Sequence, residues 1–391
     1  MIELDVAPRR TRIAEADGGP ARYLVLGDFG GRAGEPQALD RDNLNDVLSI
    51  LQVNAGGMRL RQLDDFHPDS LFERFEMALP APEPERERAT PQADLESLLR
   101  PTSLLEQIAA GGSDPFEDYV KDLARAHAAA PEMSRGSKDL TERMNSLLHH
   151  PRFQALEAAW RGVDFVVREM DDAAARVSIV QFSQNDLAVD LASENLKATR
   201  LYSLLHSRRW TAVVGLHLFD ETSIELLAHV ALIAGDAKIP YLGQGSPGIA
   251  TQLDVLKEIP EASYVGLALP RLLLRLPYGP RTSSVESFEY EEMPGAPVHE
   301  HYLWGNAALG PLAVLARADA ENLNLDGLPA HTYRDGSEWT MKPCAEMYLT
   351  ETQVLALIDC GMMPLVSYQD RPRVRVAGFR SITGKSLPLP F

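Results

Sequence analysis

The sequence predicts a mixed α/β protein: a small N-terminal α/β unit, a linker, and then helices followed by a mainly parallel sheet covered by helices. Short apolar segments alternate with helical ones along the second half of the 391-residue chain. Near-continuous apolar strands of this kind are typical of parallel sheets that are buried on both faces. A chain of this length can form two or three domains.

The N-terminal unit is expected over residues 1–79. Residues 22–26 form a short apolar strand, and a glycine-rich loop ends it. Residues 42–51 carry apolar side chains at helical spacing, and residues 58–63 alternate as a strand does. Residues 66–71 read as a turn into another helix.

Composition changes over residues 80–93, where prolines stand among alternating glutamates and arginines. Such a stretch cannot bury a core, so it is expected to be an extended linker. It separates the N-terminal unit from a second part, residues 94–391.

The second part is expected to begin with helices at residues 94–109, 114–130 and 151–170. The last of these is the best defined, with Pro151 at its first position. Its apolar side chains recur every three or four positions, which predicts one stripe packed into the core. The candidate core residues of this main helix are Phe153, Leu156, Trp160, Val163 and Val167.

Strands and helices then alternate. Strands are expected at residues 177–182, 211–218, 238–242 and 264–269. Helices are expected at residues 187–206, 222–234 and 249–257.

Composition disfavours several kinds of partner. The chain has 56 acidic and 38 basic residues and a net charge of −18. Nucleic acid and anionic lipid both need a positive surface, so neither is an expected partner. The first residues lack the apolar stretch of a secretory signal, and no segment approaches the ~20 apolar residues of a membrane-spanning helix. Cys344 and Cys360 give no disulfide framework, which suits a reducing cytoplasm.

Residues 243–248, Gly-Gln-Gly-Ser-Pro-Gly, match the G-x-G-x-x-G pattern of dinucleotide-binding loops. In such a site the glycines let the backbone approach a pyrophosphate at a helix N-terminus. Here Pro247 removes one of the amides that would bind phosphate, and no acidic residue ends a second strand about 20 positions later. A turn is therefore the favoured interpretation, and a nucleotide-binding enzyme is the alternative.

Other candidate chemical groups are incomplete. His299 and His301 could bind a metal, but no further ligand with its own spacing accompanies them. Ser246 lacks the G-x-S-x-G frame of a hydrolase. Asp28 could be a nucleophile or a magnesium ligand, but an aspartate that accepts bonds from loop amides is favoured. We therefore expect no catalytic residue, no cofactor and no metal.

Arg271 and Arg275 lie four positions apart on one face of an expected strand. One interpretation is a half-buried strand with a solvated arginine face. The other is an arginine row that pairs with carboxylates of an adjacent subunit in bidentate geometry. The acidic residues that follow are possible partners, and the candidate subunit contacts are Arg271, Arg275, Glu286 and Glu289, with Glu291 and Glu292 in the same acidic run.

Several longer segments carry a family resemblance. They are residues 149–162 (HHPRFQALEAAWRG), 264–280, 284–288 (SVESF), 301–307 (HYLWGNA) and 361–366 (GMMPLV). In this order they resemble the large subunit of the type VI secretion contractile sheath, over roughly residues 95–379. Residues 40–44 (DRDNL) and 63–71 (LDDFHPDSL) resemble the sheath small subunit. The chain thus looks like a fusion of the two proteins, which would fix their ratio and raise their effective concentration.

The resemblance implies assembly without catalysis. In the family, heterodimers stack into a helical tube around an inner tube, and contraction drives a spike out of the cell. Interfaces that do not close generate such filaments, and exchanged strands tie neighbouring subunits together. The driving energy is a difference in packing between two lattices.

Two departures qualify this expectation. Family large subunits continue for about a further domain beyond the region that matches, and the small-subunit-like segment is short. Both missing parts contribute to polymerisation in the family. The family's recycling ATPase recognises a helix of the small subunit, and residues 1–19 contain no convincing amphipathic candidate.

The leading hypothesis is a cytoplasmic structural component of a type VI secretion apparatus, a fused sheath-subunit homologue. Its expected partners are other sheath, inner-tube or baseplate proteins, further copies of itself and the recycling ATPase. The alternative within this class is a non-polymerising cap, nucleator or regulator of the sheath or baseplate.

Overall fold

The computed structural model describes residues 19–77, 115–129, 137–335 and 337–389. The linker expected at residues 80–93 and the helix expected at residues 94–109 lie outside the described residues.

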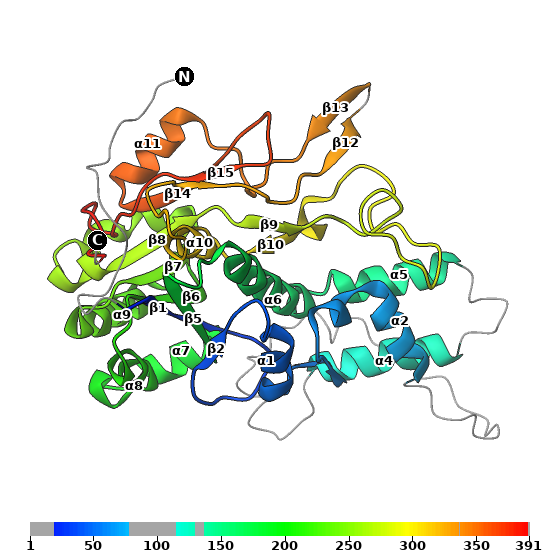
Figure 1. The fold of residues 1–391 in the computed structure, drawn as a ribbon, viewed down its shortest axis with the longest axis horizontal. Coiled ribbons are helices and arrows are strands. Elements are labelled where there is room, and N and C mark those ends of the chain that lie inside the picture. Colours follow the sequence, from blue (N-terminus) through cyan, green and yellow to red (C-terminus); the bar gives the residue numbers. More distant parts are fainter. Residues whose placement is uncertain (1–18, 78–114, 130–136, 336, 390–391) are drawn as a thin grey trace.

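One nine-stranded sheet forms the centre of the molecule (Figure 1). Its strand order is β11-β15-β14-β8-β7-β6-β1-β5-β2. The six strands from β14 to β5 are parallel to one another. β2 and β15 run antiparallel to these six, and the edge strand β11 pairs antiparallel with β15. The strands are β1 (Ala21–Gly27), β2 (Gln37–Leu39), β5 (Ala175–Gln181), β6 (Ala212–Phe219), β7 (Tyr241–Gly245), β8 (Val265–Leu269), β11 (Asn324–Leu325), β14 (Met362–Ser367) and β15 (Val374–Val376).

Helices cover both faces of this sheet, because its strands are apolar on both sides. Tyr23 and Val25 of β1 pack into one core with α6 and α10, whereas Leu24 and Leu26 pack into a second core with α7, α8 and α9. The expected α/β class is therefore confirmed. The helices are α1 (Leu44–Leu51), α2 (Pro68–Met77), α4 (Pro115–Ala129), α5 (Ser137–Leu148), α6 (Pro151–Glu169), α7 (Gln184–Leu191), α8 (Arg200–Ser207), α9 (Ile224–Ala237), α10 (Leu309–Leu315) and α11 (Glu351–Asp359).

The N-terminal segment does not fold as a separate unit. β1 lies between β5 and β6, and it pairs in parallel with both. The expectation of an independent unit over residues 1–79 is therefore wrong in this respect, because a strand of that segment completes the middle of the large sheet. Its helix α1 adds buried side chains to the core that contains α6.

Two expected helices are interrupted. The one predicted over residues 187–206 is divided into α7 and α8, because Thr199 starts a new helix by accepting a hydrogen bond from the Tyr202 N–H. The one predicted over residues 249–257 consists of short 3₁₀ turns. The strand expected at residues 58–63 shrinks to β4 (Met58–Arg59), paired with β3 (Asn54–Ala55). The 3₁₀ helices are η1 (Leu63–Phe66), η4 (Leu196–Ala198), η5 (Gly248–Thr251), η6 (Leu253–Leu256), η7 (Pro260–Tyr264) and η8 (His299–His301).

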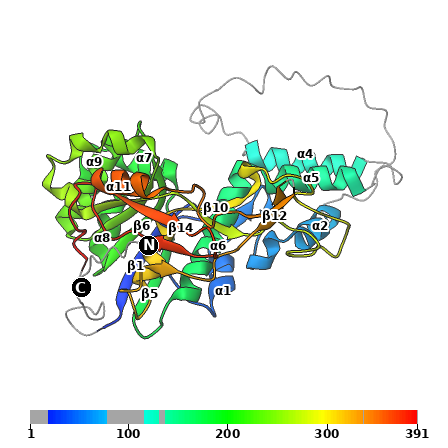
Figure 2. The ribbon, with the colours of Figure 1, turned by 90° about the horizontal axis from the view of Figure 1, so that it is seen from above.

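A second group of elements lies beside the sheet, where α2, α4 and α5 gather (Figure 2). The long helix α6 runs between this group and the sheet (Figure 1). Two small antiparallel pairs complete the fold, β9 (Leu272–Arg275) with β10 (Leu303–Gly305) and the hairpin of β12 (Thr332–Asp335) with β13 (Glu338–Met341).

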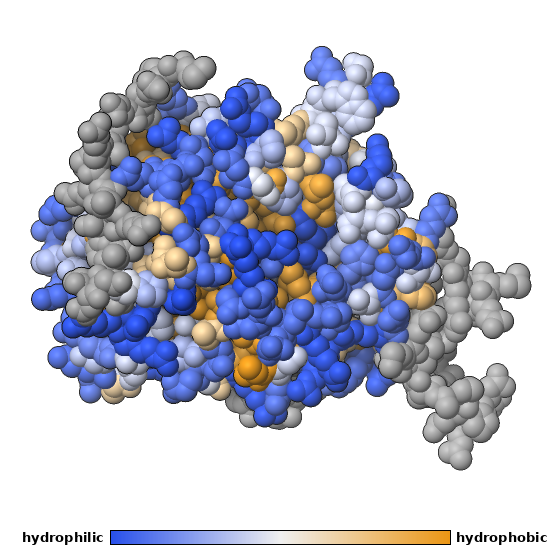
Figure 3. All heavy atoms as spheres, in the orientation of Figure 1, coloured by the Kyte–Doolittle hydropathy of each residue, from blue (hydrophilic) through white to orange (hydrophobic). Residues whose placement is uncertain are grey.

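The face seen in Figure 3 is mostly hydrophilic, with apolar side chains in narrow strips between polar ones. Within the described ranges, none of the helices combines the length and apolar character needed to cross a bilayer.

His217 of β6 is a fully enclosed histidine in the middle of the sheet. Its Nδ1 lies 2.8 Å from the Tyr241 hydroxyl, and its Nε2 lies 2.8 Å from the Phe182 carbonyl oxygen. The carbonyl can only accept, so Nε2 carries the proton and Nδ1 accepts from the tyrosine. Gly215 makes room for this arrangement, since a Cβ there would lie 1.8 Å from the Tyr241 hydroxyl oxygen.

We predict that His217 makes the protein less stable in acid. Burial lowers the pKa of His217 from 6.5 to about 4, so the unfolded chain takes up this proton before the folded one. Stability is therefore lost as the pH falls from 6.5 towards 4, by about 2 kcal/mol at pH 5 from this residue.

Urea unfolding of the wild type and of His217→Gln at pH 7 and pH 5 measures this loss. Other histidines with lowered pKa values, His67 and His301 among them, act in the same direction in both proteins. The difference between the two proteins isolates His217, and an equal loss in both would contradict the prediction.

Candidate functional site

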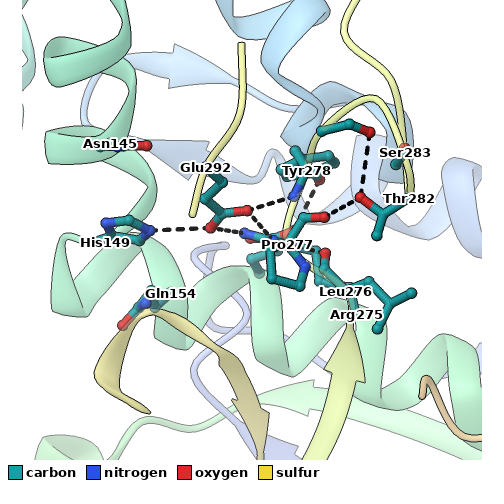
Figure 4. Close-up of polar contacts among 12 residues, drawn as sticks. Asn145, His149, Gln154, Arg275, Leu276, Pro277, Tyr278, Thr282, Ser283 and Glu292 are labelled. Atoms are coloured by element: carbon teal, nitrogen blue, oxygen red, sulfur yellow. Dashed lines mark hydrogen bonds and ion pairs between the residues drawn. The ribbon is translucent and has the colours of Figure 1, made fainter. Parts of the chain in front are cut away.

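The main polar feature of the interior is a buried charge cluster, defined here as Glu157, Arg161, Arg275, Tyr278 and Glu292 (Figure 4 shows its Arg275–Glu292 side). Helix α6 supplies the first two residues, β9 supplies the third, and the following loop supplies the others. These residues are far apart in the sequence. The cluster therefore joins α6, β9 and the loop of residues 276–292.

Arg275 is the centre of the cluster. Its Nε lies 2.8 Å from Glu157 Oε1, and its Nη1 lies 2.7 Å from Glu292 Oε2. The guanidinium also lies 4.2 Å from the centroid of the Tyr278 ring. Arg161 completes the charge balance, because its Nε lies 2.7 Å from Glu157 Oε1 and its Nη2 donates to the Tyr278 hydroxyl. Two guanidinium groups thus face two carboxylates.

Glu292 is held in its ionised form. Burial alone would raise the pKa of Glu292, but Arg275 and hydrogen bonds from His149 and the Tyr278 N–H outweigh burial and hold it at about 2. The bond from His149 Nε2 is 3.1 Å long, and that from the Tyr278 N–H is 2.8 Å. In Figure 4 the carboxylate lies between His149, Arg275 and the Tyr278 backbone.

The N-terminal segment contacts the same loop. The His67 ring packs edge-on against Tyr278, with centroids 4.9 Å apart. The Asp69 carboxylate accepts hydrogen bonds from the backbone N–H groups of Glu286, at 3.0 Å, and Ser287, at 2.8 Å. The loop of residues 276–292 is therefore held both by the N-terminal segment, through His67 and Asp69, and by the charge cluster of the second part of the chain.

The structure changes the interpretation of the two arginines. Arg275 is only 7% exposed and is fully engaged inside the chain, so its expected place on a subunit-contact surface is wrong. The acidic run does supply a partner for it, Glu292, but within the same chain. Arg271 is 40% exposed at its side chain and pairs with Glu346 through its Nε at 2.8 Å. Glu286 and Glu289 are exposed on the loop.

The apolar stripe of α6 is buried: Phe153, Leu156, Trp160, Val163 and Val167 all lie in one core. Sequence reasoning missed Glu157 on the same helix. Position 157 is four residues after Phe153 and three before Trp160, so it shares the buried face. A carboxylate at such a position signals a buried cationic partner, and Arg161 one turn later is one of the two.

The glycine-rich loop does not suit a phosphate. The Glu221 carboxylate occupies the space beside Gly248, where an added Cβ would lie 1.2 Å from Glu221 Oε1. Ser246 Oγ is 3.4 Å from the other carboxylate oxygen. A negative charge at this point repels a phosphate, so the geometry favours the turn interpretation.

The other candidate residues, His299, His301 and Asp28, have separate partners within the chain. His299 pairs with Glu346, whereas the His301 ring stacks on His149 with centroids 3.7 Å apart. Within the described residues, no group of three or more histidine, cysteine, aspartate or glutamate side chains is arranged to hold a metal. Asp28 accepts hydrogen bonds from the Gly30 N–H and the Gln181 side chain.

A groove of about 580 Å³ lies at the carboxyl ends of β1, β6 and β7. Its lining includes the first half of α6 and, from other parts of the chain, Arg271, Glu300, Tyr302 and Trp304. The carboxyl edge of parallel strands is the usual position of a ligand crevice in an open α/β sheet.

Fold and cluster together define an α/β protein in which a buried charge cluster joins parts of the chain that are far apart in the sequence. Comparison with known proteins identifies the family. The family model "VipB: EvpB/VC_A0108, tail sheath N-terminal domain" matches residues 135–251 and 249–383, so the chain belongs to this family of tail sheath proteins.

A curated relative supports the assignment. The type VI secretion system sheath protein TssC1 of Pseudomonas aeruginosa is 25% identical over 295 residues, which cover 62% of this chain. The same alignment covers 59% of TssC1, so the chain spans less than two thirds of that relative's length. The resemblance noted from the sequence is thereby confirmed at the level of the sheath family.

Proposed function

We propose that the chain is a structural component of a type VI secretion apparatus, a fused contractile-sheath subunit homologue that acts by protein–protein assembly. The observation that carries the proposal is the match of the sheath family model over residues 135–383. The named relative is itself a type VI secretion sheath protein.

We further propose that residues 1–79 descend from the sheath small subunit and residues 94–391 from the large subunit. The central place of β1 supports a permanent union of the two, because separating them would remove a strand from the middle of the sheet. A fusion would then replace a bimolecular association with an intramolecular one.

Glu286 and Glu289, with the exposed part of Arg271, are the proposed contact residues for a neighbouring subunit. The two glutamates lie on a loop whose backbone is fixed by Asp69 and Glu292, so they project from a defined position. A rigid loop loses little entropy on binding, which favours its use in an interface. The proposed partners are other sheath, inner-tube and baseplate proteins, further copies of the chain and the recycling ATPase. The proposed location of this assembly is the cytoplasm.

We predict that the purified chain assembles with increasing concentration into tubes with a helical repeat, visible by negative-stain electron microscopy. The Glu286→Lys/Glu289→Lys variant should assemble less, because it reverses two charges on the proposed contact loop. The matched control is Glu194→Lys/Glu258→Lys, which makes the same charge change at exposed positions elsewhere.

Persistent monomers or small closed rings of folded protein would overturn polymerisation and favour the cap, nucleator or regulator. Equal assembly of the two variants would remove Glu286 and Glu289 from the interface while leaving the sheath assignment in place.

A further inference from the structure

A triad of hydrogen-bonded polar side chains lies beside the groove: Lys342, His299 and Glu346. Lys342 Nζ is 3.2 Å from His299 Nδ1, and His299 Nε2 is 3.3 Å from Glu346 Oε1. An ammonium has only donors and an ionised carboxylate only acceptors. His299 therefore accepts at Nδ1 and donates from Nε2, which is the tautomer of a base oriented by a carboxylate.

Each of the three residues of this triad is held in place by a further contact. The Trp304 indole N–H donates to the His299 carbonyl at 3.0 Å. Glu346 is bound by Arg271 through both its side chain and the backbone. The Lys342 N–H donates to the His331 carbonyl at 2.8 Å, at the base of the β12–β13 hairpin. The geometry is thus set by the surrounding fold.

Lys342 also lies against two aromatic rings of the groove wall. Its Nζ is 5.1 Å from the centroid of Tyr302 and 5.6 Å from that of Trp304. Burial lowers the pKa of Lys342, although Glu346 and Glu300 oppose the change. The titratable groups around it are His299, Glu300, His331 and Glu346, with Arg271 behind Glu346.

Two other lysines have a carboxylate as their direct partner. Lys121 Nζ lies 2.6 Å from a Glu117 carboxylate oxygen, and Lys257 Nζ lies 2.6 Å from one of Asp254. A carboxylate partner favours the ammonium, and the pKa of Lys121 is raised by Glu117. The partner of Lys342 is instead an imidazole that can accept its proton. Lys342 is thus the nucleophile, His299 is its base, and Glu346 orients the base, each within hydrogen-bond reach of the next. This is the arrangement that activates an amine.

We propose that Lys342 is a reactive amine that accepts an acyl group from acyl phosphates, which makes it a modification site beside the groove, against the rings of Tyr302 and Trp304. Nζ attacks the carbonyl carbon of the donor, so that an N–C bond forms while the C–O bond to phosphate breaks. Phosphate leaves with the electron pair, and the proton lost by Nζ passes to His299 Nδ1. The product is an uncharged amide in place of the lysine cation.

The test is acylation of the full chain with acetyl phosphate, followed by site-resolved peptide mass spectrometry. The sequence has seven lysines, so every rate can be compared in one sample: Lys121, Lys138, Lys197, Lys238, Lys257, Lys342 and Lys385. We expect Lys342 to react several-fold faster than Lys121 and Lys257 at neutral pH. Its rate should also reach its plateau at a lower pH than theirs.

Two variants separate reactivity from simple exposure. His299→Gln keeps polar atoms at the position but removes the base, and Glu346→Gln removes the orienting charge; each should reduce the Lys342 rate towards that of Lys121. A Lys342 rate in the wild type no greater than that of Lys121, with the same pH profile, would overturn the proposal. That comparison needs no variant to fold. An excess rate that survives in folded His299→Gln would overturn the role of the histidine.

Discussion

Glu292→Gln should lower the free energy of unfolding by about 3–5 kcal/mol, because it removes one partner of a buried ion pair. Glu292 is 2% exposed, and its carboxylate accepts from Arg275, His149 and the Tyr278 N–H. The variant leaves two guanidinium groups, those of Arg161 and Arg275, facing the single carboxylate of Glu157. Urea unfolding at pH 7, followed by circular dichroism, measures the change.

The control is Arg168→Gln on α6, the helix that carries Glu157 and Arg161 of the cluster. Arg168 Nε lies 2.8 Å from Asp164 Oδ2, but the arginine side chain is 69% exposed, so its loss should change stability by less than about 1 kcal/mol. A double variant, Arg275→Met/Glu292→Met, should recover part of the loss, because it leaves the balanced pair of Glu157 and Arg161. The idea would fail if Glu292→Gln cost no more than Arg168→Gln.

The sequence predicts the elements of this fold better than it predicts their arrangement. Periodicity placed α6 and the buried strands β1, β5, β6 and β8 to within a few residues, because burial sets local patterns of apolar side chains. The place of β1 between β5 and β6 has no local signature. It depends on parallel pairing with strands far along the chain, and a parallel pair needs a crossover that leaves no turn signal.

The charge cluster was only partly predictable for a related reason. The sequence indicates Arg275 as a candidate subunit contact and Glu292 as part of an acidic run, so both were expected on an exposed surface. Alternation along β9 suggested a solvated arginine face, whereas α6 covers that face with Glu157. Whether a strand face meets water or another helix is decided by tertiary packing. Glu157 carried the one local clue, a carboxylate in an apolar stripe.

Trp160→Ala should lower the free energy of unfolding by about 3–5 kcal/mol, the usual range when a large buried aromatic residue is truncated. Trp160 is 0% exposed on α6, and its ring lies edge-on to Phe29 with centroids 5.3 Å apart. Its indole N–H donates to the Phe29 carbonyl at 3.0 Å. The residue therefore joins the main helix directly to the loop that follows β1.

This contact also predicts which part of the sheet the Trp160→Ala variant destabilises most. In Trp160→Ala, hydrogen exchange should accelerate more in β1 than in β8, because Phe29 belongs to the N-terminal segment. Trp160→Phe keeps an aromatic ring but orphans the Phe29 carbonyl, so it should cost about 1–3 kcal/mol. Trp339→Ala, at a side chain 66% exposed on β13, should change stability by less than about 0.5 kcal/mol. Uniform acceleration across both strands in Trp160→Ala would show that the two segments open as one unit and that Trp160 is no special link between them.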